Sequence, residues 1–255
     1  MPSEENDNLP WKLTIMKRYL FFDTETTGLP LNFHIPHRFV NNWPRLVQLS
    51  WIVTDENGNH LKTADHIIRP SGFSIPQGAS LIHGITTDMA MQKGKDLTRV
   101  VEEFLNDYEN ADLIVGHNID FDKNVVGAAI IRIGLKDIID TKPSVCTMKS
   151  STDYCALYTE YGNKWPTLQE LYKELFDESF NDAHNSASDV AATERCFWEL
   201  RHLKIIPWHT TTSGVDLPIV HTFASEREKE IMLNRNFKRV NEEVERMVNE
   251  LLGKG

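Results

Sequence analysis

Phe21-Phe-Asp-Thr-Glu-Thr-Thr-Gly28 joins an apolar run, which begins at Tyr19, to two acids and a Thr/Gly turn. This pattern is typical of a buried central strand. Alternate side chains of a strand point to one face, so Asp23 and Glu25 are predicted to lie together. Two neighbouring acids repel each other unless a cation lies between them, which indicates Mg²⁺ or Mn²⁺. Two solvated acids at a strand end are the alternative interpretation.

The sequence on either side predicts an α/β domain. Two β-type runs, 46–54 and 60–68, flank the turn Asn57-Gly58-Asn59 and indicate a hairpin. Three early strands followed by alternating helices and strands predict a mixed sheet covered by helices. The other expected elements are a helix from Leu97 to Tyr108 capped by Asp96, a strand from Asp112 to Gly116, a helix carrying Phe121 to Ile133, a helix opened by the capping box Thr167–Glu170, and a helix starting near Asn185.

Composition narrows the class of protein. The chain has 255 residues, of which 25% are charged, and its mean hydropathy is −0.39, as in a soluble globular protein. No apolar run approaches the roughly 18 residues that span a bilayer, and the N-terminus does not resemble a signal peptide. Three cysteines without a metal-binding spacing favour a reducing, cytoplasmic location. The net charge of −10 argues, at first, against a nucleic-acid partner.

Three further residues carry weak individual signals. Asp122 fits the first turn of a helix, where Asp120 could be the N-cap. Asp189 closes Ser186-Ala-Ser-Asp189, which fits a capping box. His184 lies five residues before Asp189, just outside that helix.

Taken in order, these segments resemble the DEDDh 3′–5′ exonucleases, or DnaQ-like family. This family includes the proofreading epsilon subunit of bacterial DNA polymerase III, ribonuclease T and the TREX enzymes. The resemblance covers roughly residues 19–203, and the histidine in the third motif favours the h branch over the y branch, which has tyrosine there. The matching segments are Asp23-Thr-Glu25-Thr-Thr-Gly28-Leu29, His83-Gly-Ile85, His117-Asn118 with Phe121-Asp122, and His184 with Asp189.

The resemblance implies a ribonuclease H-like fold, a mixed five-stranded sheet flanked by helices. It implies that four acids, Asp23, Glu25, Asp122 and Asp189, bind two Mg²⁺ or Mn²⁺ ions, and that His184 is the general base. Two ions about 3.5–4 Å apart stabilise both the attacking and the leaving oxygen in phosphodiester hydrolysis. A histidine with a pKa of about 6.5 accepts a proton near neutral pH.

The same resemblance implies how the strand end is bound. The backbone at Thr26 would contact the 3′-hydroxyl, Leu29 and Phe121 would wedge or stack against the last bases, and His83 would lie beside them. Core packing is the alternative for Leu29 and Phe121, and a helix–loop hydrogen bond is the alternative for His83.

Two segments exceed the compact family pattern. The connection between Gly28 and Leu46 is long, and its Arg38, Arg45, Phe39 and Trp43 either form a lip for single-stranded nucleic acid or pin the loop to the domain. His34 and His37 have no accompanying ligands, so no zinc site is predicted there. We expect an acidic N-terminal tail over 1–17, an exonuclease domain over 18–204, and an extension over 205–255 with an amphipathic helix that packs on the domain or associates with a polymerase or a second copy.

The leading hypothesis is a metal-dependent 3′–5′ exonuclease that acts on single-stranded ends, DNA favoured over RNA, and releases nucleoside 5′-monophosphates. An RNA 3′-end processing enzyme of the ribonuclease T type is the first alternative. A nucleic-acid-binding or polymerase-docking module with an inactive site is the second.

Overall fold

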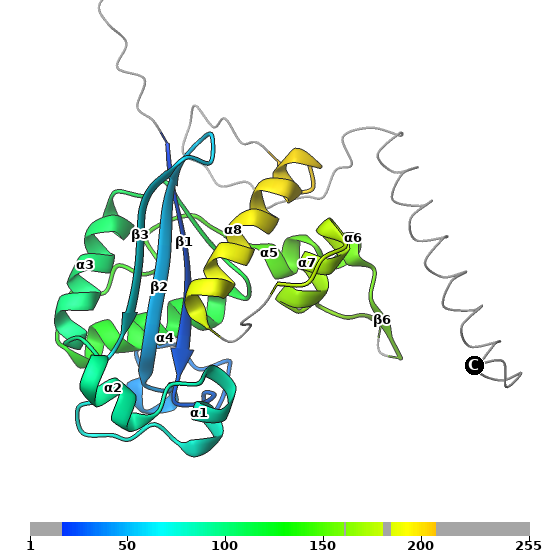
Figure 1. Cartoon of the computed structure of the whole chain (residues 1–255). Helices are drawn as coiled ribbons and strands as arrows, with labels where there is room; N and C mark the ends of the chain where they lie inside the picture. The colour runs from blue at the N-terminus through cyan, green and yellow to red at the C-terminus, as the bar shows by residue number, and fades with distance from the viewer. Residues whose placement is uncertain (1–16, 161, 181–184, 208–255) are drawn as a thin grey trace, which may run out of the picture.

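A five-stranded mixed sheet lies at the centre of the protein in the computed structural model, which describes residues 17–160, 162–180 and 185–207 (Figure 1). The strand order is β3-β2-β1-β4-β5. β1 pairs antiparallel with β2 and parallel with β4, β2 pairs antiparallel with β3, and β4 pairs parallel with β5. The strands are β1 Arg18–Thr26, β2 Leu46–Asp55, β3 His60–Ile67, β4 Leu113–Gly116 and β5 Ser144–Cys146. The predicted mixed five-stranded sheet is confirmed.

The central strand is longer than its apolar run. β1 continues through both acids to Thr26, with Asp23 opposite Ser50 and Glu25 opposite Gln48 on β2. The predicted hairpin is also confirmed, because the Asp55 carboxylate accepts hydrogen bonds from the backbone of Asn57 and Asn59 and so closes the β2–β3 turn.

Helices cover both faces of the sheet (Figure 1). Alternate side chains of β1 divide the core: Leu20 and Phe22 pack with α3 and α4, whereas Tyr19 and Phe21 pack with α7 and α8. The sheet is therefore buried on both sides, as its continuous apolar strands require. The covering helices are α3 Leu97–Glu109, α4 Ile119–Arg132, α7 Leu168–Phe176 and α8 Ser186–His202.

Several short elements have no counterpart in the sequence prediction. α1 (Gln77–His83) and α2 (Thr87–Lys93) connect β3 to α3 and bury a small apolar cluster that includes Ile75 and Ile85. The others are η1 Val40–Asn42, α5 Thr147–Ser150, α6 Thr152–Cys155, β6 Tyr158–Thr159 and β7 Gly162–Asn163. These elements are too short to show a helical or strand period in the sequence.

Two of the four helix caps predicted from the sequence are present in the structure. The Asp96 cap and the Thr167–Glu170 capping box are present as predicted. The expected cap at Ser186 is wrong, because Asn185 caps α8 and the Ser186 hydroxyl instead contacts β2. The cap at Asp120 is also wrong, because Asn118, with a left-handed backbone, precedes α4 and leaves Asp120 in the first turn.

The packed core extends slightly beyond the predicted domain. At its start, the backbone N–H of Lys17 donates to Glu56. At its end, the backbone of Ile205 and Ile206 bonds to the Leu200 carbonyl, and Ile206 is buried against α8. Among the described helices, none is both long and apolar enough to cross a membrane. The predicted amphipathic C-terminal helix, residues 1–16 of the tail and His184 lie outside the described residues.

Candidate active site

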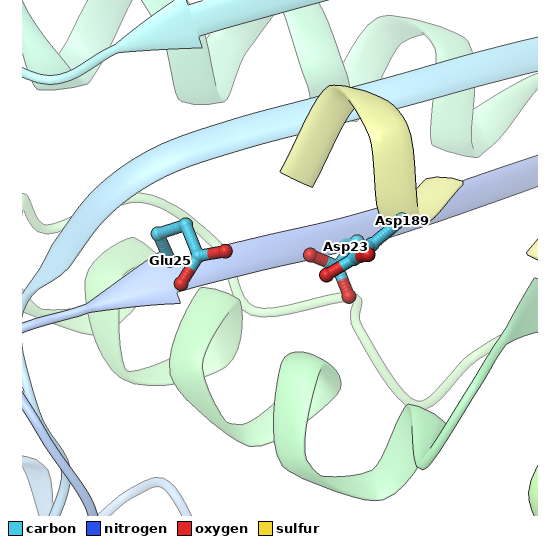
Figure 2. A group of neighbouring side chains, drawn as sticks. All are labelled: Asp23, Glu25 and Asp189. Carbon is cyan, nitrogen blue, oxygen red and sulfur yellow. The ribbon is translucent and has the colours of Figure 1, made fainter. Parts of the chain in front are cut away.

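Three acids from two distant parts of the chain meet at the end of β1. Each of Asp23, Glu25 and Asp189 offers a carboxylate oxygen, and these oxygens all lie within 4.8 Å of one another. Figure 2 shows that Asp23 and Glu25 project from β1 and that Asp189 reaches them from α8 above the strand. The predicted convergence of these three residues is therefore present in the fold.

Asp122 is not one of these three acids, but it contacts β1 through hydrogen bonds with Thr24. Its side chain is 3% exposed, and its Oδ1 accepts hydrogen bonds from the Thr24 backbone N–H at 3.0 Å and the Thr24 hydroxyl at 2.7 Å. β4 pairs with β1 only as far as Phe21, so the edge of β1 beyond that point is open to the start of α4. Ligands of α/β proteins commonly bind at the carboxyl ends of such strands.

Three of the acids, Asp23, Glu25 and Asp122, have raised pKa values and so resist ionisation. Burial raises the pKa of Asp23 well above its ordinary value, and the charges of Asp122, Asp189 and Glu25 raise it further. Burial, then Asp189 and Asp122, raise the pKa of Glu25 to about 8. Burial raises the pKa of Asp122 to about 7 although the Thr24 hydrogen bonds lower it. The causes that raise the pKa of Asp23 and Glu25 are burial and neighbouring acids.

The start of α8 is fastened to the sheet and so positions Asp189. The Asn185 side chain accepts from the Ala187 N–H, which caps the helix. The Ser50 hydroxyl donates to Asp65 at 2.7 Å, so the hydroxyl of fully buried Ser186, 2.6 Å away, donates to Ser50. Since Ser50 lies opposite Asp23 in the β1–β2 ladder, one strand pair holds both acids in register.

His117 connects the segment between β4 and α4 to Thr147 and to the segment that precedes α7. Its Nε2 lies 3.0 Å from the Pro166 carbonyl, which can only accept, so Nδ1 accepts from the Thr147 hydroxyl at 3.0 Å. Burial lowers the pKa of His117 to about 4, against the opposing effect of the Pro166 carbonyl. A neutral His117 therefore ties together the segments around the site without adding charge.

The predicted substrate-binding residues surround the end of β1 in different environments. Leu29 is 73% exposed, so core packing is wrong for this residue. Phe121 is partly buried against the core. His83 accepts a hydrogen bond at Nδ1 from the Ile85 N–H, which is the predicted helix–loop contact. Burial lowers the pKa of His83 while the neighbouring backbone of Thr26 raises it, so His83 lies beside Thr26.

The β1–β2 loop, residues 27–45, is firmly attached to α4. Trp43 is buried, and its indole N–H donates to the Ile35 carbonyl. The Arg132 guanidinium donates to the carbonyls of Val40, Trp43 and Pro44. The prediction that aromatic residues pin the loop to the domain is therefore correct for Trp43. Phe39, in contrast, is 54% exposed and does not pin the loop.

His37 provides a second attachment of the β1–β2 loop. Its Nε2 lies 2.6 Å from Asp137 Oδ2, and its backbone N–H donates to the Asn124 side chain. The ring packs so closely on α4 that a Cβ at Gly127 would lie 2.6 Å from it. This histidine is thus occupied in holding the loop.

Sequence reasoning missed the residues that orient the acids. Thr24 binds Asp122 across 98 positions of sequence, and Ser50 contacts Ser186 across 136. Small hydroxyl residues at such separations leave no periodic or motif signal. The placement of Thr24 between the two β1 acids is the only local hint.

Two curated proteins are similar to part of this chain, and in each of them the similar region is only part of the protein. DNA polymerase III PolC-type of Pediococcus pentosaceus is 31% identical over 121 residues, covering 48% of this chain and 7% of that protein. DNA polymerase III subunit epsilon of Buchnera aphidicola is 31% identical over 133 residues, covering 51% of each chain. The chain thus spans about half or less of the length of these curated relatives.

Solved structures share the fold. Exonuclease I of E. coli in complex with a dA16 oligonucleotide has a TM-score of 0.59 and 22% identity, over 73% of this chain and 41% of that one. Exonuclease I of Methylocaldum szegediense has a TM-score of 0.58 and 21% identity, over 73% and 40%. These likenesses confirm the ribonuclease H-like fold.

The family model described as "RNase_T: Exonuclease" matches residues 20–197, which include all four acids and most of the described chain. The match covers more than half of the sequence and begins within β1. The chain belongs to the exonuclease family.

Proposed function

We propose that this protein is a metal-dependent 3′–5′ exonuclease that hydrolyses phosphodiester bonds at the 3′ end of single-stranded nucleic acid, DNA favoured over RNA, and releases nucleoside 5′-monophosphates. The observation that carries the proposal is the meeting of Asp23, Glu25 and Asp189 within 4.8 Å, with Asp122 electrostatically coupled to them. Family membership supplies the reaction class, hydrolysis by an exonuclease.

The residues present fit divalent cations. Carboxylate oxygens are the preferred ligands of Mg²⁺ and Mn²⁺. Burial and mutual repulsion raise the pKa values of the acids, and bound cations would offset both effects. We propose Asp23, Glu25, Asp122 and Asp189 as the residues that hold two such ions. Bound there, the ions would supply Lewis-acid stabilisation of negative charge and make water a stronger acid.

The chain's own residues would orient the reaction. Thr26, Leu29, His83 and Phe121 lie around the end of β1 and are proposed to hold the terminal nucleotides, Thr26 through its backbone. We propose that His184 takes a proton from the attacking water, whose oxygen bonds to phosphorus as the bond to the leaving 3′-oxygen breaks. The leaving oxygen takes up a proton from solvent, which gives a new 3′-hydroxyl and a nucleoside 5′-monophosphate.

Degradation of a 5′-labelled single-stranded DNA oligomer tests this function. With Mg²⁺ we expect a ladder of products that shorten from the 3′ end, and no ladder in EDTA. Asp23→Ala should lower the rate by roughly 100-fold or more, since several kcal/mol of charge stabilisation depend on its ions. Glu102→Ala is the matched control, because Glu102 is an exposed acid on α3. Equal rates for the two variants, or activity in EDTA, would refute the proposal.

The choice between DNA and RNA needs a direct comparison. Discrimination depends on contacts to the 2′-hydroxyl. The E. coli exonuclease I named above was solved with a DNA oligonucleotide, and this supports DNA for the present chain. We expect a higher kcat/KM on a DNA oligomer than on the RNA of matched sequence. The reverse preference would instead assign the chain to RNA 3′-end processing.

Two wider proposals rest on analogy. A relative named as a DNA polymerase III subunit supports association with a polymerase, which co-purification with a replicative polymerase would test. The cytoplasm is the proposed location, and fractionation of cells that express a tagged chain would test it.

A further inference from the structure

The β1–β2 loop exposes aromatic side chains although its backbone is firmly held. Phe33 is 55% exposed and Phe39 is 54% exposed. His37 and Arg132 bind this loop to α4, and the Trp43 indole bonds within the loop to the Ile35 carbonyl. A loop anchored in this way presents its exposed rings in fixed positions, which lowers the entropy cost of binding a flat ligand.

Two arginines of this loop lie over aromatic rings. The Arg38 guanidinium lies 4.9 Å from the centroid of the Phe39 ring, and that of Arg45 lies 5.6 Å from the centroid of the Phe73 ring. Both arginines are exposed, and neither forms a carboxylate ion pair within the part of the chain that the structure describes. They remain available to phosphate, which arginine binds in a bidentate manner.

A hollow of ≈ 440 Å³ lies between this loop, α4 and the connection that follows α4. Phe33, His34 and Arg38 line it on the loop side, with Asn124, Asp137 and Asp140 opposite. The two acids are engaged, because Asp137 Oδ2 lies 2.6 Å from His37 Nε2 and Asp140 Oδ1 lies 2.7 Å from Lys123 Nζ. The hollow therefore offers polar groups and an aromatic ring without an unpaired acid.

The exposed rings are continuous with the acid site. The centroid of the Phe33 ring lies 6.5 Å from that of Phe121, and Phe121 immediately precedes Asp122. The Trp43 ring also packs near Phe121, with 6.2 Å between the ring centroids. An aromatic path thus leads from the catalytic acids along α4 to the hollow.

We propose that Phe33, Arg38 and Phe39 form a second binding surface, for unpaired nucleotides that lie upstream of the 3′-terminal ones. The rings stack on bases and Arg38 binds the backbone between them, which is the combination that grips single strands without reading sequence. This inference rests on the proposed function, because the upstream nucleotides belong to the same strand whose 3′ end lies at the acids. Charge and continuity with the acids favour nucleic acid over an apolar protein segment as the occupant.

Substrate length is the first test. We compare kcat/KM on a DNA 12-mer with kcat/KM on a dinucleotide, which is too short to extend far beyond the acids. In the Phe33→Ala/Phe39→Ala variant, the ratio of 12-mer to dinucleotide should fall roughly fivefold or more, the loss of at least one base–aromatic stack. Phe33→Tyr/Phe39→Tyr retains the rings and should keep the wild-type ratio. Leu61→Ala, an exposed apolar residue on β3, is the control.

Two results would overturn the proposal. An unchanged ratio would show that upstream nucleotides do not touch these rings. An equal loss on both substrates, accompanied by a lower Tm, would assign Phe33 and Phe39 to holding the loop.

Binding without turnover separates this inference from the proposed function. In an Asp23→Asn background, fluorescence anisotropy of a 5′-labelled dT12 measures affinity whether or not the protein cleaves. Arg38→Ala should weaken binding and reduce the slope of log Kd against log salt by about 0.7, one phosphate contact on a single strand. Arg99→Ala, an exposed arginine on α3, should do neither. If the wild type cleaves nothing while dT12 binding still depends on Arg38 and the rings, the proposed function is wrong but the binding surface is supported. If all variants bind dT12 equally, the binding surface is wrong and the proposed function is unaffected.

Discussion

At the scale of single residues, Asp23 illustrates why this site needs a cation. This half-buried carboxyl group has three acidic neighbours and a pKa well above its ordinary value, so it resists ionisation in the free protein. Thr24 offsets part of this cost at Asp122 by donating two hydrogen bonds to it. The fold thus spends stability on an arrangement that is useful only to a positively charged ligand.

This arrangement predicts a pH dependence of stability in metal-free protein. The folded-state pKa values are raised, to about 7 for Asp122 and about 8 for Glu25, so folding favours the protonated acids. The resulting stability is complete below the unfolded pKa values near 4 and is lost as the pH rises through 7 and 8. Relative to other groups, the acids should cost several kcal/mol between pH 5 and pH 8.5, at about 1.4 kcal/mol for each unit by which a folded-state pKa exceeds pH 5.

Thermal unfolding in EDTA measures this loss. We expect the Tm to fall by about 10 °C or more over that pH range and Mn²⁺ to restore it at pH 8.5. Asp23→Asn should flatten the profile and raise the Tm of the metal-free protein at pH 8.5. A profile in EDTA that matches that of Asp23→Asn would contradict this account.

The acid pair on β1 could be predicted from sequence, because period two places Asp23 and Glu25 on one face whatever the surrounding fold. The support of Asp122 by Thr24 could not, because it joins residues 98 positions apart. The exposure of Leu29 and the loop-holding role of His37 likewise depend on packing that no local pattern encodes.

At the scale of elements, the contact between β2 and α8 determines where Asp189 lies. Ser186→Ala removes the donor to Ser50 and should destabilise the protein by about 1 kcal/mol. A small shift of the first turn of α8 would move Asp189 away from the β1 acids, so kcat/KM should fall about tenfold. Exonuclease assays and chemical denaturation measure the two effects.

Ser188→Ala is the matched control in the same turn, where no side-chain hydrogen bond accompanies the backbone N–H bond to Asn185. Comparable losses of activity in the two variants would indicate that the Ser50–Ser186 contact does not position the acid.

Long elements were predictable and short ones were not. The hairpin, α3 and α7 carry a full period together with a turn or cap signal. The seven-residue helices α1 and α2 end at Gly84 and Gly94 before a period develops. The cap of α8 moved to Asn185 because Ser186 is buried against the sheet, a tertiary effect that overrides the local preference.

At the scale of the whole molecule, the negative charge is concentrated where it can be used. Residues 11–204 contain 20 Lys and Arg and 26 Asp and Glu, a net charge of −6. The four site acids account for four of these charges, and two divalent ions would bring the region to about −2. The overall acidity therefore does not exclude a nucleic-acid substrate.

Because residues 11–204 carry a net negative charge, we expect them to bind a strand mainly near its end. We expect the slope of log Kd against log salt for single-stranded DNA to be about +2 or shallower, which corresponds to about three phosphate contacts. The measurement uses dT oligomers of increasing length in the Asp23→Asn background. A steep slope that grows with every added nucleotide would show a broad basic surface instead.

The close contact between Gly127 and His37 has a consequence for the family's evolution. A Cβ at position 127 would lie 2.6 Å from the imidazole ring, so neither position can vary freely while the other stays the same. Relatives with a side chain on α4 at this point should carry a smaller residue in place of His37 and a differently seated loop. The two positions should therefore covary among relatives, and an alignment of the family would test this.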